Sequence, residues 1–186
     1  NYTKPTHFEK DYTSMLSPHF AINKVFSKEL SVYGAYSKGY KAPVSSNFFV
    51  PVSTSSAFVD STLKPEIGNQ YEIGTKGSLL HDKLVYQLAL FDAIFSNKMS
   101  AVAVTQGSTT LYSYIVNSGK QDNKGIEASV KYTAFESGNS FFTMVRPWAN
   151  FTYSKFRYKD YLFKGVNYNE NKVAGVPPIT FNVGVD

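Results

Sequence analysis

The histidines are the residues of this 186-residue sequence best suited to metal binding or acid–base chemistry, and there are three: His7, His19 and His81. They are far apart, and no H-E-x-x-H pattern places two of them on one helix face. Cysteine is absent, which removes thiolate ligands and cysteine nucleophiles. No nucleophile elbow, phosphate loop or dinucleotide fingerprint occurs either. We therefore expect no catalytic residue, no metal site and no enzyme activity.

Aromatic side chains offer a different chemistry, because their rings can stack on a ligand. The chain has 14 Tyr and 15 Phe, and several of them fall in the long links described below. The candidate ligand-binding aromatics are Phe48, Phe49, Phe58, Tyr112, Tyr114, Tyr158, Tyr161 and Tyr168. The alternative is that these rings pack the links on one another or form an aromatic girdle.

Arg157 is the one cation added to this candidate binding site. It is one of two arginines in the sequence, and its planar guanidinium suits an anionic ligand. Pairing with a nearby carboxylate is the simpler alternative. The lysines are spread from Lys4 to Lys172 without a dense block, although the net charge is +5. Nucleic-acid binding requires clustered charge, so we expect no nucleic-acid partner.

Apolar and polar residues alternate with a period of two in three stretches: 71–79, 126–133 and 179–185. This is the period of a β-strand whose two faces meet different surroundings. Weaker alternation runs through 16–26, 30–40, 84–96 and 141–155. The sequence therefore predicts an all-β protein with about seven strands.

The links between these stretches alternate in length. The short links are 27–29, 80–83 and 135–139. The long, polar links are 42–68, 105–117 and 158–175. Short turns at one end and long loops at the other are typical of outer-membrane β-barrels, whereas Greek-key sandwiches have no such asymmetry. No run of 18 apolar residues is present to span a membrane as a helix. We therefore expect an antiparallel transmembrane β-barrel segment.

In such a barrel one face of each strand meets lipid and the other meets the lumen. The residues expected to face lipid include Ile73, Val130 and Phe181. Those expected to face the lumen include Glu72, Lys131 and Asn182. Cross-strand ion pairs are the simplest explanation for the lumen charges, which are Glu72, Lys76, Glu127 and Lys131. Seven strands cannot close a barrel, so we expect further strands at both ends.

Four patches carry a resemblance to a known family. They are Tyr-Ser-Lys-Gly-Tyr-Lys-Ala-Pro at 36–43; Leu-Lys-Pro-Glu at 63–66 with Tyr-Glu-Ile-Gly at 71–74; Asn-Ser-Gly at 117–119 with Lys-Gly-Ile-Glu at 124–127; and Val-Pro-Pro at 176–178 with Thr-Phe-Asn at 180–182. In order and spacing they resemble the C-terminal half of the barrel of TonB-dependent outer-membrane receptors.

The resemblance implies that residues 1–186 are part of a roughly 22-stranded barrel, with the plug domain and both barrel ends outside this sequence. It implies a multi-pass β-barrel in the cell outer membrane. The implied partners are outer-membrane lipid, the receptor's own plug domain and the TonB energy-coupling complex, which acts through an N-terminal region. The implied function is active import of a ferric siderophore, with iron present only in the transported chelate and no cofactor. Uptake of cobalamin, haem or an oligosaccharide, a passive pore, and a barrel enzyme are the alternatives.

Overall fold

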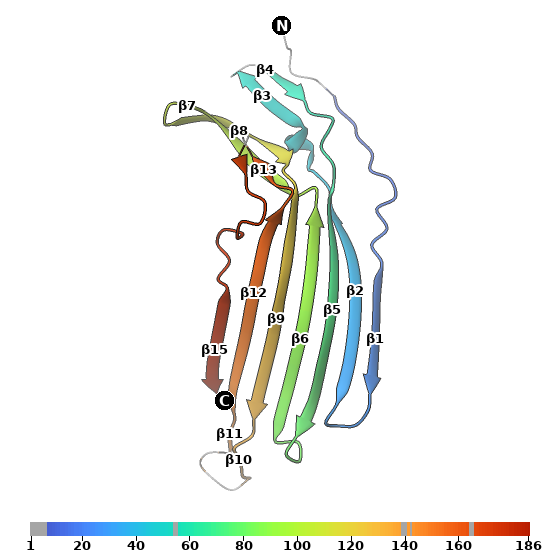
Figure 1. Ribbon diagram of the computed structural model, residues 1–186, viewed down its shortest axis with the longest axis vertical. Helices are drawn as coiled ribbons and strands as arrows, with labels where there is room; N and C mark the ends of the chain where they lie inside the picture. Colours follow the sequence, from blue (N-terminus) through green and yellow to red (C-terminus); the bar gives the residue numbers. More distant parts are fainter. Residues whose placement is uncertain (1–6, 54–55, 139–140, 142, 164–165) are drawn as a thin grey trace.

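A single antiparallel sheet forms the body of the protein. The computed structural model describes residues 7–53, 56–138, 141, 143–163 and 166–186. Seven strands follow one another across the sheet in chain order (Figure 1). They are β1 (His19–Val25), β2 (Ser31–Lys41), β5 (Glu66–Leu79), β6 (Leu84–Ser96), β9 (Lys120–Tyr132), β12 (Pro147–Lys159) and β15 (Ile179–Val185). The prediction of an all-β antiparallel protein with about seven strands is confirmed.

Short hairpins fill the links between the strands. At one end lie the 3-10 helix η1 (Ser45–Phe48) and three two-stranded sheets (Figure 1). These sheets are β3 (Phe49–Ser53) with β4 (Ser56–Val59), β7 (Met99–Gln106) with β8 (Thr109–Asn117), and β13 (Leu162–Phe163) with β14 (Val166–Asn167). At the opposite end β10 (Phe135–Glu136) pairs with β11 (Met144–Val145). We call the end with three hairpins the upper end.

Two of the predicted links, and the strand that follows one of them, have wrong boundaries. The link expected at 135–139 runs over 133–146, because Phe135 and Glu136 pair with Val145 and Met144 as a hairpin of their own. The following strand, expected at 141–155, therefore covers Pro147–Lys159. The long link expected at 105–117 spans 97–119, because β7 and β8 form a hairpin that pairs with none of the seven strands of the main sheet.

The register places the alternating residues on two continuous faces. One row across the sheet contains Ile22, Gly34, Ile73, Leu90, Ile126, Tyr153 and Ile179. The adjacent row, on the other face, contains Asn23, Tyr33, Gly74, Ala89, Glu127, Thr152 and Thr180. We call the face that carries the first row the apolar face and the face that carries the second row the polar face. The expected sharing of faces is confirmed: Val130 and Phe181 lie on the face of Ile73, whereas Lys131 and Asn182 lie on that of Glu72.

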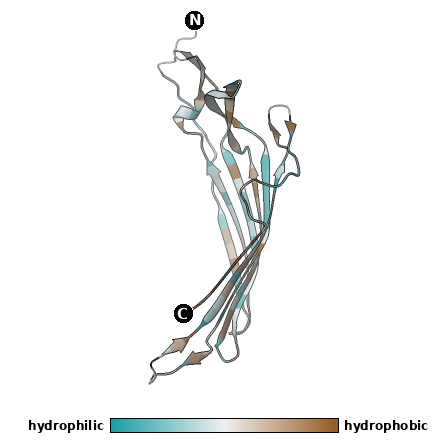
Figure 2. Ribbon diagram, turned by 90° about the vertical axis from the view of Figure 1, so that its left-hand side faces the viewer, coloured by the Kyte–Doolittle hydropathy of each residue, from teal (hydrophilic) through white to brown (hydrophobic). Residues whose placement is uncertain are grey.

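The sheet is twisted (Figure 2), and its two faces differ in exposure. On the apolar face, 56% of Ile73 and 61% of Phe181 are exposed. On the polar face, Ala89 is buried, as is Gly74. Side chains crowd one another on the concave side of a curved sheet and spread apart on the convex side. The polar face is therefore the concave one, as a barrel lumen requires.

Rings lie over glycines on the polar face. Four aromatic–glycine pairs stand directly opposite one another on neighbouring strands: Tyr33 with Gly74, Phe91 with Gly125, Trp148 with Gly184, and Phe95 with Gly68. A Cβ built on Gly74, Gly125 or Gly184 would lie 2.4–2.5 Å from a ring atom. Each ring thus occupies the space above its glycine, so the ring can lie flat against the polar face.

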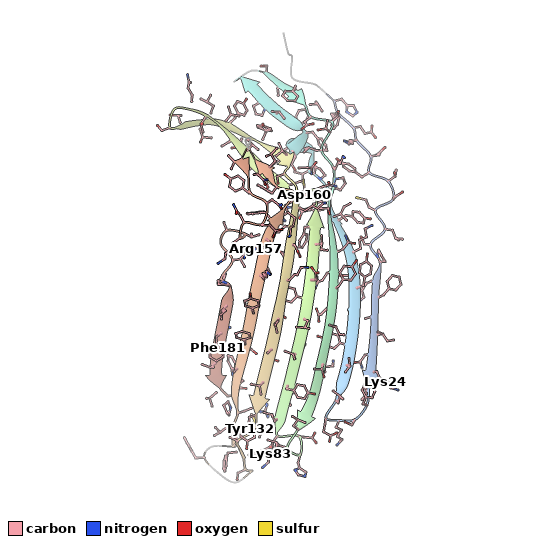
Figure 3. All side chains as sticks on the ribbon, viewed as in Figure 1. Lys24, Lys83, Tyr132, Arg157, Asp160 and Phe181 are labelled. Atoms are coloured by element: carbon pink, nitrogen blue, oxygen red, sulfur yellow. The ribbon has the colours of Figure 1, made fainter. Side chains whose placement is uncertain are left out.

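The apolar face changes character along the strands. In β5 the apolar part runs from Tyr71 to Leu79, close to the roughly 9–11 residues with which a strand crosses a bilayer. At its upper boundary the Phe20 and Tyr36 rings lie 6.5 Å apart, and the Tyr36 and Tyr71 rings 5.1 Å apart. Such an aromatic row suits a membrane–water boundary. Figure 3 shows Phe181 well below Arg157, which lies near the upper end of β12.

Polar contacts on the concave face only partly follow the expected ion pairs. Lys131 pairs with Asp186, with 2.6 Å between Nζ and Oδ2. Glu72 instead accepts a 2.7 Å hydrogen bond from the Tyr33 hydroxyl. Lys76 lies over the Tyr33 ring, 6.0 Å from its centre. One of the four lumen charges is therefore held by an ion pair, and its partner is a residue that the sequence did not single out.

Candidate functional site at the upper end of the barrel wall

The bases of the first two long links are held together by Asn117. Its side-chain oxygen accepts a 2.8 Å hydrogen bond from the backbone N–H of Lys64, and its amide donates to the Lys64 and Asn97 carbonyls at 2.9 Å each. Asn97 in turn donates to the Pro65 carbonyl at 3.3 Å. Two of the patches quoted for the family resemblance, around 63–66 and 117–119, therefore meet in space.

An ion pair reinforces this contact. The carboxylate of Glu66 is buried, and its Oε1 accepts a 2.7 Å hydrogen bond from Lys98. A buried carboxylate requires such a partner, because its desolvation is costly. Gly119 completes the junction at φ +131°, a conformation that L residues rarely adopt, and a Cβ there would lie 2.4 Å from the Asp160 carbonyl oxygen. We call residues 63–66, 97–98 and 117–119 the clasp.

The third long link is attached to the clasp through hydroxyl groups. Tyr161 donates a 3.4 Å hydrogen bond to Ser100, whose hydroxyl is 2.8 Å from that of Ser118. A hydrogen bond from Lys120 holds the pKa of Asp160 below its usual range, and one from Lys159 does the same for Glu170. The three long links are therefore joined at their bases.

Three tyrosines form a cluster where the third link leaves β12. The Tyr158 and Tyr161 rings are 4.6 Å apart, and the Tyr161 and Tyr168 rings meet edge to face at 5.9 Å. We call these residues the tyrosine trio. Tyr158 belongs to the polar face, because it lies in the row that contains Gln121 and Phe95. The trio therefore begins on the concave wall and continues into the link above it.

A hollow of about 390 Å³ lies on the concave wall just below the upper end. It is lined by Ser37, Gly39, Tyr40, Lys41, Glu66, Gly68, Asn69, Gln70, Ala93 and Phe95. Gly39 and Gly68 stand directly opposite each other in the register. The hollow exists because these adjacent positions carry no side chain. Lys41 gives it a cation, while Phe95 provides a ring.

Comparison with known proteins identifies the family. One family profile, described as "TonB dependent receptor-like, beta-barrel", matches residues 1–186. The chain belongs to this family. No curated protein matches it. TonB-dependent receptors are outer-membrane barrels that transport ligands, with a plug domain and TonB as their general partners. The apolar face of this receptor barrel therefore meets outer-membrane lipid, and the polar face lines the lumen.

The long links of this TonB-dependent receptor lie on the extracellular side, as in outer-membrane barrels generally. Of the predicted site residues in the first link, Phe48 is buried and its ring lies 5.0 Å from that of Phe8, whereas Phe58 is 45% exposed on β4. Phe49 is half-buried on β3. Phe48 thus packs the link, as the alternative interpretation has it, while Phe58 offers a surface to solvent.

The other predicted residues lie at separate places on the receptor. Tyr112 and Tyr114 are half-buried on one face of β8, opposite Val104 and Val102. Among the described site residues, ring contacts join Tyr158, Tyr161 and Tyr168. Arg157 lies on the apolar face, since its row contains Asn69, Ile94 and Asp122. It donates a 2.9 Å hydrogen bond to the Glu170 carbonyl, and its place on the apolar face separates it from the residues of the concave wall.

The described part of the receptor contains no group of three or more His, Cys, Asp or Glu side chains that could hold a metal ion. His7 lies 3.8 Å from Glu9, and both are exposed. Over the same described residues, no helix has the length and hydropathy to cross a membrane.

Sequence reasoning missed the hollow and the clasp. A signal for the hollow was present, because Gly39 and Gly68 both fall on the polar side of their strands. For the clasp, the motif positions can be read from the sequence but their contact cannot, since Lys64 and Asn117 are 53 residues apart.

Proposed function

We propose that this receptor barrel imports a ferric siderophore, which binds at the upper end between the tyrosine trio and the hollow around Gly39 and Gly68. The observation that carries the proposal is that the hollow and Tyr158, the first residue of the trio, both lie at the upper end of the concave wall. A passive pore has no need for such a surface, whereas a large chelate must be held before it is moved.

Several physical features support this ligand class. Tyrosine rings offer rigid stacking surface at low entropic cost. Lys41 in the hollow supplies a cation for an anionic chelate. The joined bases of the long links fix the positions of these groups, which reduces the ordering required on binding. Iron enters this proposal only within the chelate, and no resident cofactor is involved.

The membrane assembly is part of the same proposal. The edges of the sheet, β1 and β15, each carry a row of backbone groups without a neighbour in the described sheet. Unpaired backbone groups are costly in lipid. We propose that further barrel strands pair with both edges, that the plug domain fills the lumen, and that the TonB complex acts on the receptor from the periplasm.

The binding site is tested by removing the rings of the trio. In the receptor expressed from its complete gene, the triple substitution Tyr158→Ala, Tyr161→Ala and Tyr168→Ala should weaken siderophore binding at least about tenfold, because a few aromatic anchors supply most of a binding energy. Fluorescence titration with a panel of ferric siderophores, haem, cobalamin and oligosaccharides measures this loss.

Leu162→Ala is the matched control, because Leu162 is exposed on β13 in the same link. It should bind as the wild type does. Saturable siderophore binding that survives the triple substitution would reject the trio as the site. Saturation by haem, cobalamin or an oligosaccharide alone would reject the siderophore, and no binding by any panel member would favour the pore.

A further inference from the structure

A second hollow, of about 190 Å³, lies at the upper end of β12 on the side away from the lumen site. It forms because the chain that pairs with β12 bulges. Val173 donates to the Phe156 carbonyl at 3.1 Å, and Ser154 donates to the Pro178 carbonyl at 2.8 Å. On β12 a single residue, Lys155, separates Ser154 from Phe156. On the facing segment, residues 174–177 separate Val173 from Pro178. The surplus residues arch away from β12 and leave the hollow.

Three cations line this hollow: Lys155, Arg157 and Lys172. Within the described residues none of the three takes part in an ion pair, although Lys120, Lys124, Lys131 and Lys159 all do. The Arg157 side chain donates one N–H to the Glu170 carbonyl. Its backbone forms an isolated antiparallel β-bridge with the backbone of Lys172. The remaining donors of its guanidinium, and both ammonium groups, are available to an anion.

The nearest carboxylates are already engaged. Asp122, opposite Arg157 in the register, lies 3.4 Å from the Lys124 ammonium, which also pairs with Asp92 at 3.0 Å. Glu170 pairs with Lys159. Lys155 stands opposite Lys124, and the Glu170 carboxylate is attracted by Arg157 and Lys155 less strongly than by Lys159. With three cations beside the single carboxylate of Glu170, which already pairs with Lys159, the hollow keeps a net positive charge.

The hollow lies at the upper boundary of the apolar face. Lys155 and Arg157 lie on the apolar face, directly above Tyr153 and in line with Phe151 on the same strand. Tyr153, Val173, Val176 and Pro178 give the hollow an apolar lining beside its cations. Lys155 stands in the row of Tyr36 and Tyr71, the aromatic boundary of the apolar face, and Arg157 in the row above. Figure 3 shows Arg157 well above Phe181, which lies in the lipid-facing band.

We propose that this hollow binds a phosphate group of an outer-leaflet lipid. A lipid headgroup presents its phosphate at the membrane boundary, where Arg157 and the two lysines meet it with charge-assisted hydrogen bonds. The apolar part of the lining then contacts the start of the lipid's hydrocarbon. This site faces away from the lumen, so it is independent of ligand import.

The test uses the receptor purified in detergent from its complete gene, with lipid A carrying two phosphates as the probe. Native mass spectrometry measures how much lipid each variant retains. The double variant Lys155→Gln and Lys172→Gln should lose about tenfold in affinity, because two charge-assisted contacts are removed. Lipid A with its phosphates removed should bind the wild type as weakly as intact lipid A binds the double variant.

Three comparisons decide the outcome. Lys38 lies in the row of Arg157 on the apolar face, four strands away from it. Lys38→Gln therefore removes a charge at the same height and should leave binding unchanged. The charge-keeping variant Lys155→Arg and Lys172→Arg should bind as the wild type does, which shows that the site is folded. Equal losses in Lys38→Gln and the double variant, undiminished binding by the double variant, or displacement of the lipid by millimolar inorganic phosphate would each overturn the proposal.

Discussion

Replacing Ala128 with lysine is expected to destabilise the receptor barrel by about 2–4 kcal/mol, whereas replacing the adjacent Ser129 should cost less than about 1 kcal/mol. Ala128 lies on the apolar face in the row of Leu88 and Phe181, midway between the rows of Tyr71 and Leu79. A lysine there must desolvate its charge or extend far along the strand. Ser129 lies on the polar face, opposite Gln87, where a lysine stays in water.

The pair is well matched, because both residues are small and they are neighbours on β9. Urea titration of the receptor folded into lipid vesicles, followed by its heat-sensitive mobility on a gel, gives the two changes in unfolding free energy. Equal losses for Ala128→Lys and Ser129→Lys would show that the two faces of β9 meet the same environment, contrary to this account.

The second large effect is expected at Gly125 on the concave wall. A Cβ there would lie 2.4 Å from the Phe91 ring and 2.4 Å from the Tyr153 carbonyl oxygen. Because one of these neighbours is backbone, Gly125→Val cannot be accommodated by turning a side chain. We expect a loss of about 3 kcal/mol, at the upper end of typical overpacking costs.

Gly39→Val is the control for Gly125→Val. Gly39 lies on the same face, but a Cβ there would meet nothing within 4 Å. The added side chain should leave stability within about 1 kcal/mol of the wild type, because valine suits a strand and crowds no neighbour. The same urea titration measures both variants. A Gly125→Val receptor as stable as Gly39→Val would contradict the close ring–glycine packing of the inner wall.

Alternation in the sequence was sufficient to predict the strands and their faces. Residues 71–79 and 126–133 carry the pattern clearly because one side of each strand meets lipid and the other water. Alternation along β12 also puts Arg157 on the face of Phe151 and Tyr153, because even numbers of residues separate the three. Its position outside the lumen could therefore have been inferred. That inference was missed because the alternation of β12 was assigned only as far as residue 155.

Other features depend on contacts that no local pattern records. The β10–β11 hairpin is short and has no alternation to reveal it, so the start of β12 was placed too early. The clasp joins Lys64 to Asn117 across the β5–β6 and β7–β8 hairpins. The hollow depends on Gly39 and Gly68 standing opposite each other on neighbouring strands. Such features require the register, which periodicity alone does not fix.

The most direct test of the barrel wall is an accessibility scan along β9. These 186 residues contain no cysteine. Single cysteines at 126–131 can therefore each carry a spin label in the receptor expressed from its complete gene, with any cysteine elsewhere in that gene replaced by serine, and folded into vesicles. Labels at 126, 128 and 130 should be relaxed mainly by oxygen, which concentrates in lipid. Labels at 127, 129 and 131 should be relaxed mainly by a water-soluble nickel chelate. A scan without this alternation, or with the opposite phase, would contradict the assignment of the apolar face to lipid and the polar face to the lumen.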